Sequence, residues 1–254
     1  MKKLNFLMIG AALCLPSLSH AAINRGVIGS PHDFSTNYWA FQYGSHRVCE
    51  VCHAVHHTDP NQIAPLWAHA TTTNSFIPYN NTPGQYTGTQ DSTPAAPGGV
   101  SLACLSCHDG TVGLNQTASG GFMGTTNAVY IDPTYIIPDN GNDLHTTHPI
   151  SIVYNTALAT LDGGLEDPMT YTIGSPKTRL TYQTAPEPTT WSGTSLHGLT
   201  IDKAMLFNHK VECASCHDVH KMDGSSPSSG IMARLSGDDA GAKGSLLCRT
   251  CHVK

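Results

Sequence analysis

The chain has 254 residues, of which 39% are hydrophobic and only 12% are charged, and it contains 24 glycines and 16 prolines. This composition favours turns and irregular backbone, and the few apolar runs cannot build a core in proportion to the length of the chain. The formal net charge of −5 argues against a nucleic-acid partner.

The N-terminal residues 1–21 are typical of a secretory signal peptide. A basic start at Lys2 and Lys3 precedes an apolar stretch, and cleavage is expected after Ala21. The apolar stretch is shorter than the roughly 20 residues that a membrane-spanning helix needs, and we expect no membrane span elsewhere. The sequence therefore predicts an exported protein with a single domain over residues 22–254.

Regular structure is expected to be sparse along the mature chain. The segments 70–100 and 112–147 are rich in Thr, Gly, Asn and Pro and are predicted to be loops. Two segments alternate apolar and polar side chains as short strands do, namely 150–154 (ISIVY) and 178–182 (TRLTY). With short helices expected around the cysteine motifs, the predicted fold class is mostly irregular and coil-rich.

Apart from Cys14 in the signal peptide, every cysteine lies in a C-x-x-C pair that is followed at once by histidine. The four strings are CEVCH, CLSCH, CASCH and CRTCH. Their cysteines are Cys49, Cys52, Cys104, Cys107, Cys213, Cys216, Cys248 and Cys251, and their histidines are His53, His108, His217 and His252. We call them the first to fourth motifs.

The repeated motif is the attachment signature of c-type haem. Two thiols add across the two vinyl groups at one porphyrin edge, and the adjacent histidine reaches the iron from one face. Zinc ribbons do not require a histidine after each pair, and C-x-x-C disulfides are redox-active and not structural. A thioredoxin-like site would need a βαβ pattern. The sequence therefore predicts four covalently bound haem c groups with four proximal histidine ligands.

The other histidines of the mature chain are candidates for the second axial position of each iron. Their number favours bis-histidine ligation, which gives lower reduction potentials than histidine–methionine ligation. Methionines are expected to fill space instead. Five histidines are the candidates for four distal places: His32, His56, His69, His148 and His220. The alternatives are His57, His145, His197 and His209.

His56 and His220 each follow a proximal histidine by three residues. The proximal histidine holds one face of its own haem, and a residue three positions further along cannot reach the opposite face of that ring. We therefore expect these two histidines to bind iron in a neighbouring haem.

The order SPHDFS, CEVCHAVH, APLWAHATTT, ACLSCHDGTVG, HPISIVY, KVECASCHDVH and LCRTCH resembles the small multihaem cytochromes of metal-reducing bacteria, above all the tetrahaem outer-surface cytochromes that polymerise into filaments. The resemblance covers nearly the whole mature chain. The segment TIGSPKTRLTYQTAPEPTTW departs from it.

The resemblance implies a chain wrapped around a continuous stack of bis-histidine haems and exported to the cell surface or beyond. It also implies a head-to-tail homopolymer in which His56 ligates a haem of the adjacent subunit. Other cytochromes and extracellular electron acceptors would be its partners, and it would not be an enzyme. Two alternatives are a monomeric periplasmic electron shuttle and a multihaem reductase with one open iron position.

Overall fold

The computed structural model describes residues 27–41, 48–55, 63–79, 91–137, 142–173, 196, 198–220, 234 and 246–253. The predicted signal peptide and the predicted strand at 178–182 lie outside these ranges.

The described residues are coil-rich, with short helices and a two-stranded sheet. In chain order the elements are η1 (Phe34–Thr36), α1 (Tyr38–Phe41), α2 (Gly99–His108), η2 (Pro133–Tyr135), β1 (Ile152–Val153), α3 (Thr156–Asp162), α4 (Ile201–Met205), β2 (Lys210–Val211), α5 (Cys213–Cys216) and α6 (Leu246–Cys251). Among them, no helix has the length and apolar character that crossing a membrane requires.

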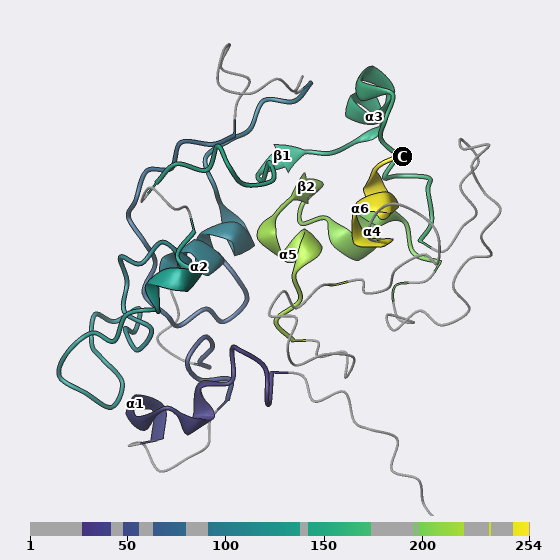
Figure 1. The fold of residues 1–254 in the computed structure, drawn as a ribbon. Coiled ribbons are helices and arrows are strands. Elements are labelled where there is room, and N and C mark those ends of the chain that lie inside the picture. The colour runs from purple at the N-terminus through teal and green to yellow at the C-terminus, as the bar shows by residue number, and fades with distance from the viewer. Residues whose placement is uncertain are drawn as a thin grey trace, which may run out of the picture.

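The second and third motifs meet near the middle of the molecule. Figure 1 shows α2 and α5 close together there, with α1 toward one end and α3 toward the other. α5 contacts both α2 and α4. β1 and β2 pair antiparallel, with Ile152 opposite Val211, so the strand that leads into the third motif is tied to residues 152–153. β1 lies within the predicted strand at 150–154, whereas β2 was not predicted.

α3 shows how local sequence sets the boundaries of these short elements. The side chain of Asn155 accepts a hydrogen bond from the backbone N–H of Leu158 at its N-terminus. Gly163 ends the helix with a φ of 69°, a left-handed conformation that glycine adopts without a steric cost.

Nine of the buried apolar residues in the described ranges form two small clusters. One consists of Tyr154, Ala159, Ile173, Ile201, Ala204 and Met205. The other consists of Phe76, Leu105 and Leu144 against α2.

Candidate functional site

Each motif is a single helical turn, which brings its two cysteines and its histidine to the same region of backbone. In the first, third and fourth motifs, the histidine N–H donates to the carbonyl of the first cysteine, over 2.8 Å for His53, 3.0 Å for His217 and 2.9 Å for His252. The second motif forms the C-terminal turn of α2, which ends at His108. Short helical turns therefore lie at all four motifs.

The cysteines of successive motifs lie next to one another. A hydrogen bond between the thiols of Cys104 and Cys213 raises the pKa of Cys104 and lowers that of Cys213. Burial raises the pKa of Cys107, and nearby Cys52 raises it further. Burial also raises the pKa of Cys216, and nearby Cys248 raises it further. Motifs that are consecutive in the chain are therefore also close together in space.

Three of the four motif histidines face a second histidine ring. The ring centres are 6.0 Å apart in the pair His32–His108 and 6.0 Å apart in His53–His220. They are 6.3 Å apart in His148–His252. All three second histidines belong to the five predicted distal candidates, and none follows its partner closely in the sequence.

This spacing fits two imidazoles on opposite sides of one metal ion. A metal–imidazole nitrogen bond is about 2 Å long and the ring centre lies about 1 Å further out, so two such rings have centres about 6 Å apart. Aromatic rings that stack directly on one another also have such distances between their centres. The contacts of the ring nitrogens are therefore as important as the spacing for identifying a metal-binding pair.

The Nδ1 atoms of these rings lie close to backbone carbonyl oxygens. The distance is 2.7 Å from His53 to Pro65, 2.8 Å from His108 to Tyr135, and 2.9 Å from His148 to Pro149. A histidine that ligates metal commonly donates its second ring N–H in this way, because the hydrogen bond fixes the tautomer with a lone pair on Nε2. The contacts therefore suit Nε2 ligation.

The ring of His32 is suited to binding metal because it stays neutral. Burial, together with the proximity of His108 and His217, lowers its pKa to about 4. At neutral pH the imidazole carries no proton on one nitrogen, so a lone pair is available. The effect of His217 also shows that the proximal histidine of the third motif lies near His32.

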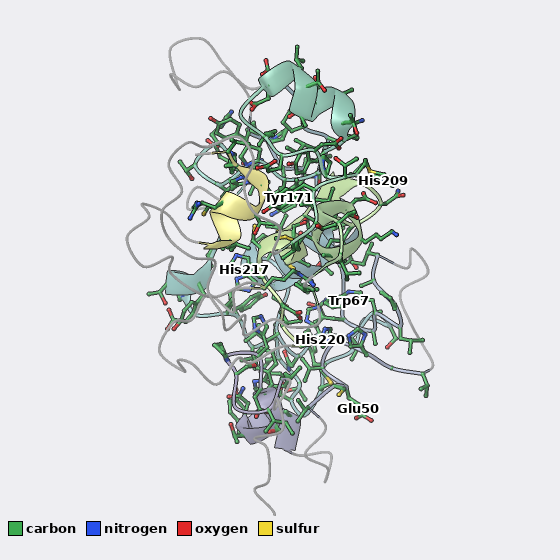
Figure 2. The ribbon with its side chains drawn as sticks, turned by 90° about the vertical axis from the view of Figure 1, so that its right-hand side faces the viewer. Glu50, Trp67, Tyr171, His209, His217 and His220 are labelled. Carbon is green, nitrogen blue, oxygen red and sulfur yellow. The ribbon has the colours of Figure 1, made fainter. Side chains whose placement is uncertain are left out.

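His220 follows the third motif in sequence but pairs with the first. Figure 2 shows His217, His220 and Glu50 of the first motif in succession down the molecule. The pairing with His53 agrees with the expectation that His220 serves a haem other than that of its own motif. Ligation itself stays a prediction.

His69 was predicted as a distal candidate, but its contacts indicate a role within the fold. It is 1% exposed, and its Nδ1 and Nε2 lie 2.8 Å and 2.9 Å from the carbonyl oxygens of Ala70 and Gly113. Burial lowers its pKa, although the neighbouring backbone groups oppose that effect. Within the described ranges no motif histidine is paired with this ring, and its candidacy as a ligand is not supported.

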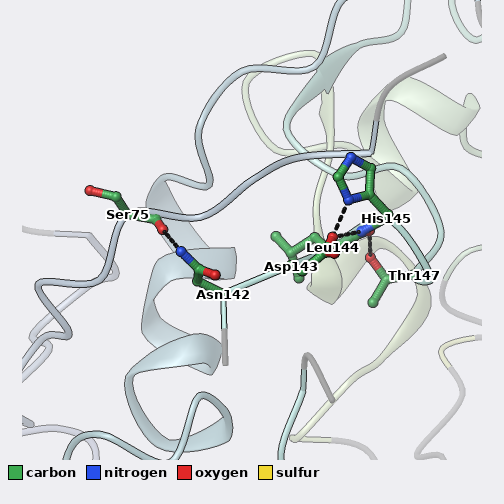
Figure 3. A network of polar contacts seen from close by, with 6 residues as sticks. All are labelled: Ser75, Asn142, Asp143, Leu144, His145 and Thr147. Carbon is green, nitrogen blue, oxygen red and sulfur yellow. Dashed lines mark hydrogen bonds and ion pairs between the residues drawn. The ribbon is translucent and has the colours of Figure 1, made fainter. Parts of the chain in front are cut away.

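Two of the alternative histidines are held by carboxylates. His145 contacts Asp143 in the polar loop of Figure 3, where Asn142 also donates to the carbonyl of Ser75 over 2.9 Å. This loop leads directly to His148. His209 is exposed, and its Nδ1 lies 2.6 Å from Asp202. Three remaining candidates lie outside the described residues, namely His56, His57 and His197. The distal partner of His217 is therefore not assigned.

The side chain of Trp67 leaves a buried hydrogen-bond donor beside the first motif. Its ring is edge-on to His53, with centres 6.2 Å apart, and it is 9% exposed. The indole Nε1–H is buried and meets no hydrogen-bond acceptor in the described part of the chain. Buried donors are nearly always satisfied, and a haem carboxylate would supply an acceptor. The residues around this motif therefore fit haem.

Glu212, which sequence reasoning did not single out, joins the second and third motifs. Its carboxylate is buried at 5% exposure and accepts from Ser101 of α2 and, over 3.0 Å, from Ser151. The Ser101 hydroxyl in turn accepts from the N–H of Cys213 over 2.9 Å. Burial raises the pKa of Glu212 even though both serines oppose that effect. A charged residue before a motif has no sequence signal that distinguishes it from a surface residue.

Comparison of the chain with protein-family models and with curated proteins finds no match in either.

Proposed function

We propose that the chain is a tetrahaem c-type cytochrome that transfers electrons and is exported to the cell surface. The observation that carries the proposal is the set of three motif histidines that each face a second histidine ring at 6.0–6.3 Å. The buried indole donor beside the first motif supports the same group, and none of the eight motif cysteines takes part in a disulfide.

Haem supplies a one-electron iron couple when it is bound. The residues of this chain then have distinct tasks. The cysteines would attach the group, and the motif histidines would bind its iron. His32, His148 and His220 would serve as second ligands, and nearby backbone carbonyls orient several of these rings. An iron held by two protein ligands would have no open position for a substrate. This would apply to the irons of the first, second and fourth motifs, which favours electron transfer over catalysis.

Haem stoichiometry is the direct test. Chain purified from a host that can attach c-type haem should give four haems per polypeptide by pyridine haemochrome, and a mass larger than that of the bare chain. Replacing both cysteines of one motif by alanine should reduce the count to three. A colourless protein with the mass of the bare chain would overturn the proposal.

The distal assignment has its own prediction. His32→Ala, His148→Ala and His220→Ala should each leave four attached haems but convert one of them from low spin to high spin, because one axial ligand is lost. The visible and EPR spectra report this change, and binding of carbon monoxide should appear with it. His209→Ala is the matched control and should stay fully low spin. Fully low-spin spectra in all three variants would contradict the assignment.

The filament is proposed from the resemblance, and so is ligation of a neighbouring subunit's haem by His56. A contact between different surfaces of successive subunits makes an open polymer when it does not close into a ring. His56→Ala should abolish filaments in electron micrographs of material sheared from cells, whereas His57→Ala should preserve them. Filaments that persist in His56→Ala would exclude His56 as this ligand. A chain that stays monomeric in both His56→Ala and His57→Ala would favour a periplasmic shuttle.

A further inference from the structure

Arg234 closes the C-terminal end of α5, the helical turn of the third motif. Its backbone N–H donates to the carbonyl of Cys216 over 2.7 Å, and its Nε donates to the carbonyl of Ala214 over 2.8 Å. The last carbonyls of a helix have no partner within the helix and need one elsewhere. Arg234 supplies it at the point where α5 leads into His217.

The guanidinium of Arg234 is held on several sides. Nη1 lies 3.5 Å from the carbonyl of Ala204 in α4 and 3.7 Å from a carboxylate oxygen of Asp218. The guanidinium carbon lies 5.7 Å from the centre of the Phe207 ring. The side chains of Arg234 and Asp218 are only 15% and 20% exposed. A partly buried charge is screened by salt much less than a surface charge.

The side chain of Arg234 lies against the third motif. Its Nε donates to the carbonyl of Ala214, between the two cysteines, and its Nη1 lies 3.7 Å from the carboxylate of Asp218, next to His217. The charge is also fixed in place, because a planar guanidinium with several hydrogen bonds has few alternative positions.

We propose that Arg234 raises the reduction potential of the haem at the third motif, with Asp218 acting in the opposite direction. This inference rests on the proposed function. Reduction of ferric iron adds one electron and removes one positive charge from the site. A fixed cation nearby therefore favours the reduced form, and a nearby anion favours the oxidised form.

The test is a potentiometric titration of the haem-loaded protein, followed by its visible spectrum. In Arg234→Gln, one of the four one-electron transitions should shift to lower potential while the other three stay in place. Arg234→Lys keeps a cation and should show a smaller shift in the same direction. Asp218→Asn should shift the same transition upward.

Lys203→Gln is the matched control, because it removes an exposed cation from α4 and should leave all four transitions in place. Arg234→Gln with four low-spin haems and an unchanged titration would overturn the inference. If Arg234→Gln loses a haem or does not fold, Asp218→Asn becomes the deciding variant. An unchanged potentiometric titration of Asp218→Asn would then overturn the inference. A wild-type chain without haem would instead refute the proposed function.

Discussion

Glu212 is a single carboxylate on which the contact between α2 and α5 depends. Because burial raises its pKa, the folded protein binds this proton more tightly than the unfolded chain does. Its contribution to stability is therefore greatest below the usual pKa of glutamate, 4.5, and is lost as the pH rises through the raised value. We predict that Glu212→Gln removes this loss of stability with rising pH. Denaturant unfolding across a pH series measures the free energy of unfolding that shows it.

Ser151→Ala gives the opposite variant at the same site. It removes a hydrogen-bond donor to the carboxylate, so the pKa of Glu212 should rise further and the loss of stability with pH should become larger. Glu212→Ala leaves the buried Ser101 hydroxyl without its acceptor and should cost roughly 1–3 kcal/mol. Identical pH profiles in wild type and Glu212→Gln would contradict the prediction.

The residues of the candidate site were predictable to different degrees. The eight cysteines and four motif histidines follow from a five-residue pattern, because covalent attachment fixes their spacing. His32, His148 and His220 could be proposed only as members of a larger set. The motif histidine that each of these three would face depends on the path of the chain between the two residues. Trp67 and Arg234 carry no local pattern, because their roles come from burial and from contacts that are distant in sequence.

At the scale of elements, the contact between Trp39 and Gly124 positions the segment that carries His32. Gly124 has a φ of 67°, and a Cβ at this position would overlap the backbone carbonyl of Trp39. Phe34 packs on Trp39 at 5.5 Å and on His32 at 6.3 Å between ring centres. Close approach of the loop at Gly124 therefore determines where residues 34–39 lie.

Gly124→Ala is predicted to destabilise the protein by roughly 3 kcal/mol or more, because the steric overlap adds to the cost of a left-handed alanine. Gly120→Ala is the matched control. Its φ is 88° and nothing lies within 4 Å of the added Cβ, so only the conformational cost of about 1 kcal/mol remains. Denaturant unfolding measures both variants. Equal losses would show that Gly124 does not need to approach Trp39 closely.

The elements themselves were only partly predictable. β1 fell within a predicted strand, because residues 150–154 alternate in the expected way. β2 has only two residues, and its pairing with β1 depends on the third motif lying beside it. α3 escaped prediction although Asn155 precedes it and Gly163 follows it, both common boundary residues. A helix of seven residues is too short for a clear apolar periodicity.

At the scale of the whole molecule, the two apolar clusters in the described part of the chain hold six and three buried residues, which is a small interior to fold around. We predict that replacing all eight motif cysteines by alanine abolishes cooperative unfolding, because no covalent group then contributes apolar contacts to the interior. Circular dichroism during heating and limited proteolysis would measure this. Replacing the cysteines of the fourth motif alone should preserve a transition at lower temperature. A sharp transition in the cysteine-free chain would contradict the prediction.

The three histidine pairs overlap along the polypeptide. His32–His108 overlaps His53–His220, which in turn overlaps His148–His252. Any single backbone cleavage between His32 and His252 therefore falls within at least one of the three spans. If each pair shares an iron, the two fragments of a nicked molecule remain joined by coordination. They would migrate together under native conditions and separate only when the ligands are displaced.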